Sequence, residues 1–174
     1  MAALLPVRAD AQQQQEASIF APYVGVTTGG QTTATGTTYG FSTAYVAGSS
    51  WGAEFDLAHS TKFNEDYQSS GLTTVVINLM VGPQITPRLR LYGVAGGGLI
   101  RARGCLVSDC VREFSVTDFG WDAGGGAYVL VNDFVGARAD VRYFRYGAVK
   151  EELPRQGEGA FDFWRISFGG FLQW

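Results

Sequence analysis

The chain has 174 residues with a formal net charge of −3; 14% of its residues are aromatic and only 17% are charged. This composition excludes a disordered chain, and the small charge without a basic stripe excludes a nucleic-acid-binding protein. No run of 18 apolar residues occurs, which excludes a transmembrane helix but leaves a membrane β-barrel open, because barrel strands alternate in polarity.

The N-terminal residues 1–18 are predicted to lie outside the folded domain. Residues 2–7 are apolar and residues 9–11 match an A-x-A cleavage pattern, so we interpret this segment as a truncated signal peptide remnant followed by a polar tail. An ordinary disordered tail is the alternative. Residues 19–174 are then expected to form one domain.

Strand patterns follow one another through the rest of the chain, and helix periodicity is almost absent. The predicted strands are 19–28, 37–47, 51–61, 72–84, 89–101, 117–131, 134–148 and 161–174. Their connections alternate between short ones (48–50, 85–88, 132–133) and longer ones (29–36, 62–71, 102–116, 149–160). Short turns at one end and long loops at the other are typical of an outer-membrane barrel with periplasmic turns and extracellular loops.

Charged residues share one face of several predicted strands, and apolar residues share the other. Two packings could explain this pattern. In a soluble, lipocalin-like barrel the charges would face water, whereas in a membrane barrel they would pair inside a narrow lumen. Gly124 and Gly126 on the polar face would leave room for arginines, which favours the membrane barrel. The predicted lumen charges are Glu54, Asp56, Asp122, Arg138, Asp140, Arg142 and Arg165.

Aromatic residues fall near both ends of the predicted strands, which is typical of the two interfacial girdles of a membrane barrel. Aromatics packing a soluble core are the alternative. Strand 89–101 has apolar residues on both faces, and we expect Tyr92 and Ile100 to face lipid. The predicted interfacial aromatics are Trp51, Tyr92, Trp121, Tyr143, Trp164 and Trp174.

The last strand carries large apolar residues at alternate positions up to the final tryptophan. We expect it to pair with the first strand and close the barrel, because lipid cannot satisfy unpaired backbone groups. Its lipid-facing residues, which would form the terminal insertion strand, are Trp164, Ile166, Phe168, Leu172 and Trp174.

Five segments resemble the outer-membrane β-barrel domain family, small eight-stranded barrels of the OmpA and OmpX type. They are PYVGV (22–26), WGAEFD (51–56), LYGVAGGGLIRAR (91–103), VGARADVRYFR (135–145) and FDFWRISFGG (161–170). The resemblance implies an all-β, eight-stranded antiparallel up-and-down transmembrane barrel in the outer membrane of a Gram-negative bacterium. It also implies insertion by the barrel-assembly machinery, which reads a terminal aromatic; Trp174 stands where phenylalanine is usual. We expect a monomer without cofactor, surrounded by outer-membrane lipid and lipopolysaccharide.

Two small groups of residues are candidates for chemistry. Cys105 and Cys110 are the only cysteines, and in an exported protein they indicate a disulfide rather than a metal site. His59, Ser60 and Glu65 are similar to the triad of lipid A deacylases, but adjacent strand residues point to opposite faces, which argues against a nucleophile and base pair.

The resulting hypothesis is a non-enzymatic outer-membrane barrel with a structural role, whose surface loops serve adhesion or recognition. Loop residues such as Glu65, Asp66 and Tyr67 would contribute to that role. A lipocalin-like soluble carrier of an apolar ligand is the first alternative, and a lipid A-modifying outer-membrane enzyme is the second.

Overall fold

The computed structural model describes residues 16–29, 35–48, 50–61, 70–105, 113–147 and 161–174. These residues form nine strands, whose bounds are β1 Ala17–Gly29, β2 Thr35–Ala47, β3 Trp51–Thr61, β4 Ser70–Val81, β5 Gln84–Thr86, β6 Leu89–Cys105, β7 Glu113–Leu130, β8 Val135–Tyr146 and β9 Phe161–Gln173. None of the described segments is a helix long and apolar enough to cross a membrane.

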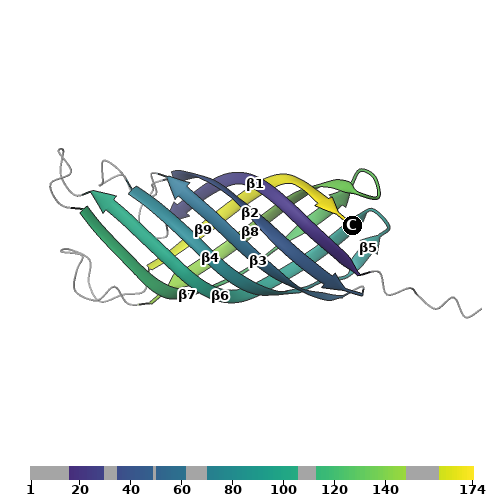
Figure 1. Cartoon of the computed structure of the whole chain (residues 1–174), viewed down its shortest axis with the longest axis horizontal. Coiled ribbons are helices and arrows are strands. Elements are labelled where there is room, and N and C mark those ends of the chain that lie inside the picture. The colour runs from purple at the N-terminus through teal and green to yellow at the C-terminus, as the bar shows by residue number, and fades with distance from the viewer. Residues whose placement is uncertain (1–15, 30–34, 49, 62–69, 106–112, 148–160) are drawn as a thin grey trace, which may run out of the picture.

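Eight of these strands form a closed antiparallel barrel, as the sequence predicts (Figure 1). Neighbours in sequence pair with each other, β4 pairs directly with β6, and β1 pairs with β9 to close the cylinder. At this seam Ser18 and Trp174 exchange main-chain hydrogen bonds of 3.0 and 3.1 Å. Closure leaves the barrel without an open edge, which is the condition for a sheet to stand in hydrocarbon.

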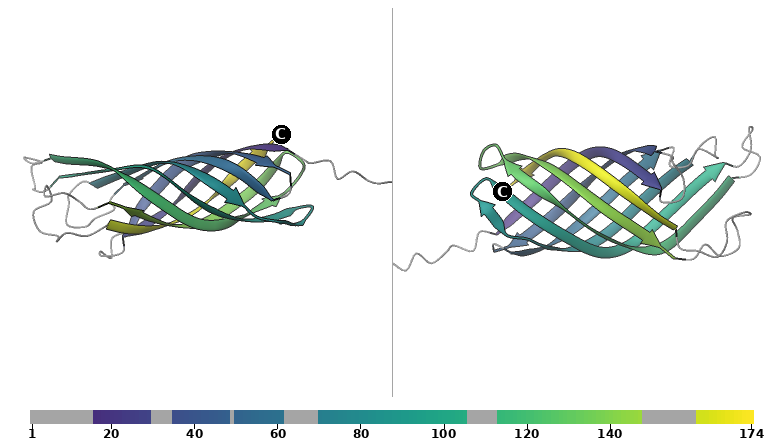
Figure 2. Two further views of the ribbon diagram at one scale, coloured as in Figure 1. Left: turned by 90° about the horizontal axis from the view of Figure 1, so that it is seen from below. Right: turned by 180° about the vertical axis from the view of Figure 1, so that it is seen from behind.

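The two ends of the barrel differ, as the views in Figure 2 also show. We call the end where β2–β3, β4–β6 and β7–β8 connect the turn end, and the opposite end the loop end. At the turn end Gly48 has a φ of 65°, a left-handed conformation that glycine adopts without strain. The remaining connections, at the loop end, lie outside the described residues.

Several predicted strand bounds need correction. The predicted strand 72–84 is divided: β4 runs from Ser70 to Val81, and Gln84 belongs to β5, which extends into the predicted turn 85–88 and pairs with β6. The segment 102–116 was expected to be a loop, but β6 continues to Cys105 and β7 begins at Glu113, with these two residues paired. The polar residues here were read as a loop, whereas backbone pairing continues past the apolar surface regardless of side-chain polarity. β1 also begins at Ala17, two residues before the predicted start.

Side chains alternate strictly between the inside and the outside of the barrel. On β8 the exposed positions carry Val135 and Val141, while the intervening arginines and aspartate are buried. The same alternation exposes Phe55 on β3 and buries Glu54 and Asp56. The outer surface at mid-height is therefore apolar, and the inner face carries the charges.

This arrangement predicts a depth-dependent cost for a charge on the outer surface. Ile77→Arg replaces a side chain that is 67% exposed at mid-barrel on β4 and should lower the free energy of unfolding by about 2–4 kcal/mol. Val131→Arg, 70% exposed beside the turn after β7, should cost only about 0–1 kcal/mol. Urea unfolding in phospholipid vesicles measures both, and equal costs would contradict the assignment of the mid-barrel surface to lipid.

Candidate functional site

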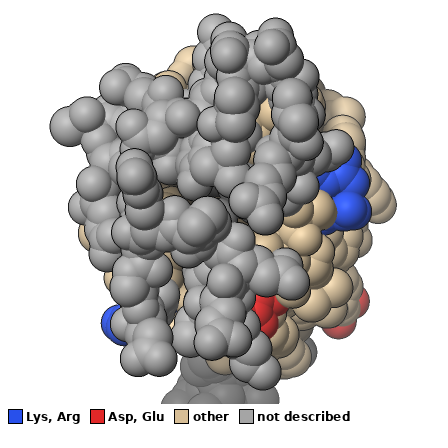
Figure 3. Space-filling view, turned by 90° about the vertical axis from the view of Figure 1, so that its left-hand side faces the viewer, with Lys and Arg blue, Asp and Glu red and all other residues tan. Residues whose placement is uncertain are grey.

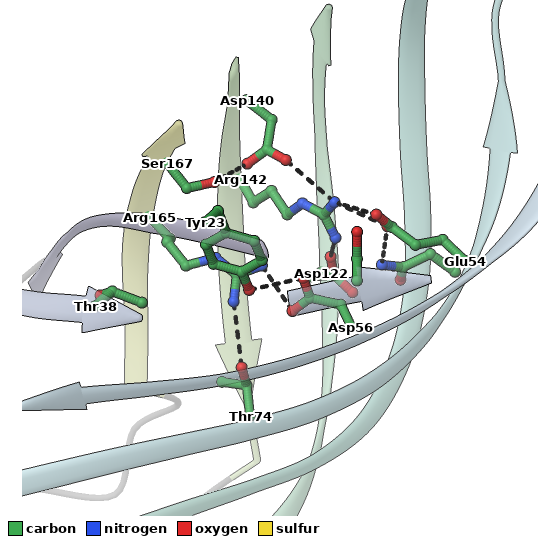
Figure 4. Close-up of polar contacts among 12 residues, drawn as sticks. Tyr23, Thr38, Glu54, Asp56, Thr74, Asp122, Asp140, Arg142, Arg165 and Ser167 are labelled. Carbon is green, nitrogen blue, oxygen red and sulfur yellow. Dashed lines mark hydrogen bonds and ion pairs between the residues drawn. The ribbon is translucent and has the colours of Figure 1, made fainter. Parts of the chain in front are cut away.

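Seven charged side chains meet inside the barrel at mid-height, and each is at most 3% exposed. We call this group the ionic belt; it comprises Glu54, Asp56, Asp122, Arg138, Asp140, Arg142 and Arg165. The residues come from β3, β7, β8 and β9, so strands far apart in sequence supply both signs of charge (Figure 4). These are the residues that the sequence predicts for the lumen.

Arg138 lies between two carboxylates and two hydroxyl groups. Its Nη2 lies 2.9 Å from Glu54 Oε1, and its Nε donates to Asp140 Oδ2 at 3.0 Å. The same Nε lies 2.9 Å from the Tyr92 hydroxyl, and Nη1 donates to Ser42. A buried guanidinium needs several such acceptors because burial removes its water.

Arg142 contacts three of the four carboxylates of the ionic belt. Its Nη2 lies 2.8 Å from Glu54 Oε2 and 3.3 Å from Asp140 Oδ2, as Figure 4 shows. Its Nη1 is 3.6 Å from Asp122 Oδ2, a longer contact. Glu54 therefore pairs with two arginines: Arg138 and Arg142 both donate to its Oε1, and the Asn78 amide donates to Oε2 at 3.3 Å.

Arg165 forms an ion pair with Asp56. Nη2 lies 2.8 Å from Asp56 Oδ1, and Nη1 donates to Thr74 at 3.3 Å. The hydroxyl of Tyr23 donates to the other Asp56 oxygen at 2.8 Å. Arg165 also packs over the ring of Phe144, with the guanidinium carbon 4.8 Å from the ring centroid.

Asp122 is the least compensated member of the belt. Four carboxylates face three guanidiniums, which leaves one negative charge in excess. Neither Asp122 oxygen accepts a hydrogen bond from the described residues, and Arg142 is its only ion-pair partner there. The Oδ1 of Asn78 is likewise without a donor in this part of the structure.

Gly96 lies between Asn78 and Asp122 in the sheet. In the strand register Asn78 lies opposite Gly96, and Gly96 lies opposite Asp122. A Cβ on Gly96 would lie 2.0 Å from the main-chain oxygen of Ile77 and 2.1 Å from Asn78 Oδ1, so only glycine fits there. Gly124 plays the corresponding role for Arg142, whose Cγ would lie 2.9 Å from a Cβ at that position. The glycines on the polar face thus make room for the belt.

Apolar layers lie on both sides of the ionic belt. The turn-end layer consists of Ile19, Ala21, Ala44, Val46, Met80, Tyr92, Val94, Tyr128 and Phe171, with Leu130 against it. The loop-end layer consists of Leu72, Val76, Ile100, Ala102, Phe144, Tyr146 and Phe163, with Phe161 against it. Beside the loop-end layer, the hydroxyls of Thr27, Thr38 and Ser60 bond one another at 2.7 to 2.9 Å.

The described interior is therefore packed at three levels. A cavity of about 360 Å³ opens at the turn end, and Tyr128 of the turn-end layer forms part of its lining. Among the described residues, no group of three or more His, Cys, Asp or Glu side chains could hold a metal ion. The belt can hold the strands in register and fill the lumen, because its three arginines pair closely with Glu54, Asp56 and Asp140.

Tyr92 and Ile100 do not face lipid, so that prediction is wrong. They are 5% and 0% exposed, while Leu91 and Leu99 take the outward positions at 44% and 54%. Apolar residues on both faces made the strand ambiguous, and the hydroxyl of Tyr92 decides its side. It donates to Asp140 at 3.0 Å, a bond that lipid could not provide. Tyr92 thus belongs to the interior and not to an interfacial girdle.

The other predicted interfacial aromatics lie on the outer surface. Trp51, Trp121, Trp164 and Trp174 are 45% to 69% exposed. Tyr143 is half-buried between two of them, with ring centroids 5.7 Å from Trp121 and 5.1 Å from Trp164. On β9, the remaining residues of the predicted insertion strand, Ile166, Phe168 and Leu172, are also exposed.

The residues considered for catalysis are separated by the barrel wall. His59 points outward, where its Nδ1 lies 2.9 Å from Thr73 Oγ1. Ser60 points inward and is buried among hydroxyl groups. Glu65 lies outside the described residues. Cys105 ends β6, and Cys110 lies outside the described residues, so their disulfide stays a prediction.

Sequence reasoning missed the neutral partners of the belt, namely Tyr23, Ser42, Thr74, Asn78 and Ser167. Each occupies an inward position, and Ser42 and Ser167 lie opposite Asp56 and Asp140 on the neighbouring strands. A polar residue on the same face as the charges was the available signal.

Charges inside and apolar side chains outside define a transmembrane β-barrel. The lipocalin-like alternative is wrong, because Arg138 and Arg142 are buried while Phe55 and Val141 are exposed. The family of the outer membrane protein beta-barrel domain matches residues 1–169, and the chain belongs to this family. It is a bacterial outer-membrane protein.

Solved structures of small outer-membrane barrels have the same fold. Neisserial surface protein A is 14% identical, with 90% of this chain and 96% of that one covered and a TM-score of 0.67. OprG from Pseudomonas aeruginosa is 13% identical, with 91% and 95% covered and a TM-score of 0.63. Ail of Yersinia pestis is 14% identical, with 92% and 99% covered and a TM-score of 0.58. No curated protein matches this chain significantly.

Removing one arginine from the ionic belt should destabilise the barrel. Arg142→Met leaves Glu54 and Asp122 with less compensation and should lower the free energy of unfolding by about 3–5 kcal/mol. Arg88→Met, at an exposed turn position, should change it by about 0.5 kcal/mol or less. Urea unfolding in vesicles compares the two; similar losses would show that the belt is not a stabilising network.

The excess negative charge of the belt predicts the opposite effect on stability when Asp122 is neutralised. Asp122→Asn removes that excess and takes no hydrogen-bond acceptor from a described donor, so stability should stay equal or increase. Asp56→Asn takes the ion-pair partner from Arg165 and should cost about 3–5 kcal/mol. A loss for Asp122→Asn as large as that for Asp56→Asn, in the same unfolding assay, would contradict the unequal roles of these aspartates.

Proposed function

We propose that this protein is a non-enzymatic outer-membrane barrel that has a structural role and presents its loop end at the cell surface for adhesion or recognition. The observation that carries this proposal is the packed interior. Between the two apolar layers, the ionic belt engages three guanidiniums with four carboxylates. A filled eight-stranded lumen supports a structural barrel rather than a pore.

The absence of enzymatic activity is supported by the position of the candidate residues. His59 and Ser60 lie on opposite sides of the wall, so they cannot form a nucleophile and base pair. The lipid A-modifying alternative requires such a pair.

Adhesion or recognition is assigned to the connections at the loop end, which include Glu65, Asp66 and Tyr67 and lie outside the described residues. Loops on a rigid scaffold are where binding residues concentrate. One barrel of the same fold, Ail of Yersinia pestis, is named for attachment and invasion. At this level of identity the likeness is one of fold, and the role in this chain is our proposal.

The surroundings of the barrel belong to the same proposal. Residues 1–16, which precede β1, would be the signal remnant and tail, and the outward row of β9 ending at Trp174 would be read by the barrel-assembly machinery. The barrel would act as a monomer within outer-membrane lipid and lipopolysaccharide.

The packed lumen predicts the absence of conductance. In planar lipid bilayers the purified barrel should show no stable open steps, while a known porin serves as the positive control. Regular, long-lived conductance steps would contradict a structural role based on a filled interior.

The surface role is tested on cells. Bacteria expressing the full chain should adhere to cultured epithelial cells more strongly than bacteria expressing barrels whose loop-end connections are replaced by short Gly-Ser turns. Heat-dependent electrophoretic mobility checks that both forms fold. Equal adhesion by the two folded forms would overturn the adhesive role.

A further inference from the structure

A cavity of about 360 Å³ opens at the turn end of the barrel, which is the opposite end from the face shown in Figure 3. Ile19, Tyr128 and Leu130 line this cavity, and the same residues form part of the turn-end layer or pack against it. The layer separates the cavity from the ionic belt, so the cavity is a blind pocket and not the mouth of a pore. Its volume lies near the lower limit of ligand pockets, about 300 Å³, and therefore suits a small ligand.

Arg90 is the cationic side chain of this cavity. It lies on β6 two residues before Tyr92, and strand alternation places both side chains on the inward face. Among the described residues Arg90 forms no ion pair, whereas each arginine of the ionic belt pairs with at least one carboxylate. Its guanidinium donates to Gln84 Oε1 at 3.5 Å, which is long for a hydrogen bond. The half-buried guanidinium has therefore lost water without gaining a close anionic partner from these residues.

Two carboxylates also line the cavity, but both are exposed. Asp133 lies in the turn between β7 and β8, and Glu16 lies directly before β1. Glu16 is hydrogen-bonded to the hydroxyl of Tyr45, an exposed residue of β2. Neither carboxylate forms an ion pair with Arg90. A ligand with a single negative charge can therefore pair with the guanidinium, whereas the exposed carboxylates would repel the further charges of a polyanion.

Apolar side chains form much of the remaining lining. Phe134 and Trp174 line the cavity although they are 66% and 69% exposed, and Leu89 and Leu130 line it while half-buried. Contact with an apolar group of a ligand would remove part of this surface from water, which is favourable. The cavity thus combines one inward cation with apolar walls. Ligand pockets use this combination to hold and orient a molecule that has one polar end.

We propose that the turn-end cavity binds a small organic acid, whose single carboxylate pairs with Arg90 and whose apolar body packs against Leu130, Phe134 and Trp174. A guanidinium and a carboxylate can form two parallel hydrogen bonds, which fixes the orientation of the acid. Because the pocket ends at the turn-end layer, binding requires no passage through the lumen. The site lies at the opposite end from the surface loops, so this inference goes beyond the proposed function.

The test is a titration of the full chain, folded in phosphatidylcholine nanodiscs, with N-acetylphenylalanine as the acid. Nuclear magnetic resonance of the indole N–H groups follows binding at each tryptophan. The Trp174 signal should shift and saturate, because Trp174 lines the cavity. The signals of Trp51, Trp121 and Trp164 should not shift, since these residues lie outside the lining.

Two comparisons isolate the charge of Arg90. R90Q should weaken binding at least about tenfold. The matched control R88Q removes an exposed arginine of the same connection that does not line the cavity, and it should change binding less than about twofold. N-acetylphenylalaninamide has the same apolar body without the charge, so it should bind the wild type as weakly as the acid binds R90Q.

Several results would overturn the proposal. They are equal affinity of R90Q and the wild type, equal affinity of the acid and its amide, and shifts at Trp51 as large as those at Trp174, which would show partition of the acid into lipid. Displacement of the acid by equimolar inorganic phosphate would assign the site to free phosphate and would also overturn it. Heat-dependent mobility verifies folding of both variants. If R90Q does not fold, the comparison of acid and amide in the wild type decides alone.

Discussion

The constraint on which this structure depends is the compensation of three arginines inside a closed eight-stranded barrel. A guanidinium without water needs acceptors at hydrogen-bond distance, and Arg138, Arg142 and Arg165 each reach at least one carboxylate. Glu54, shared by two of them, ties β3 to β8 across the lumen. The belt is thus a set of cross-links between strands that are not neighbours in the sheet.

The rest of the inner face follows from this requirement. Gly96 and Gly124 lack side chains where Asn78 and Arg142 need the space. The hydroxyl of Thr74 accepts a hydrogen bond from Arg165, and the hydroxyl of Ser167 donates one to Asp140. Apolar layers then cover the belt on both sides, which keeps its local dielectric low and its ion pairs strong. Because the charged and polar side chains point inward, the outer face can be apolar, which contact with lipid acyl chains requires.

The sequence was sufficient for the fold and for the charged members of the belt, because a period of two assigns every residue of a strand to one face once a single charge is placed. Glu54, Arg138 and Arg165 were assigned in this way. The two-residue alternation did not show which face of β6 points inward, because apolar residues occupy both faces. The hydrogen bond from Tyr92 to Asp140 shows that the face with Tyr92 points inward. The alternation also ended this strand too early, at residue 101, since Arg103 looks like a loop residue although its backbone continues the ladder. The partners of each charge could not be predicted, since they depend on the stagger between strands.

Five isoleucines allow a direct test of which face meets lipid. Ile77 and Ile166 are 67% and 49% exposed at mid-barrel, Ile19 and Ile100 are 4% and 0% exposed, and Ile85 lies in the turn-end connection. With the isoleucine methyl groups labelled in lipid nanodiscs, nuclear Overhauser contacts to acyl-chain methylenes should appear for Ile77 and Ile166 and be absent for Ile19 and Ile100. Acyl contacts from Ile19 or Ile100, with none from Ile77 or Ile166, would contradict the inside-polar arrangement.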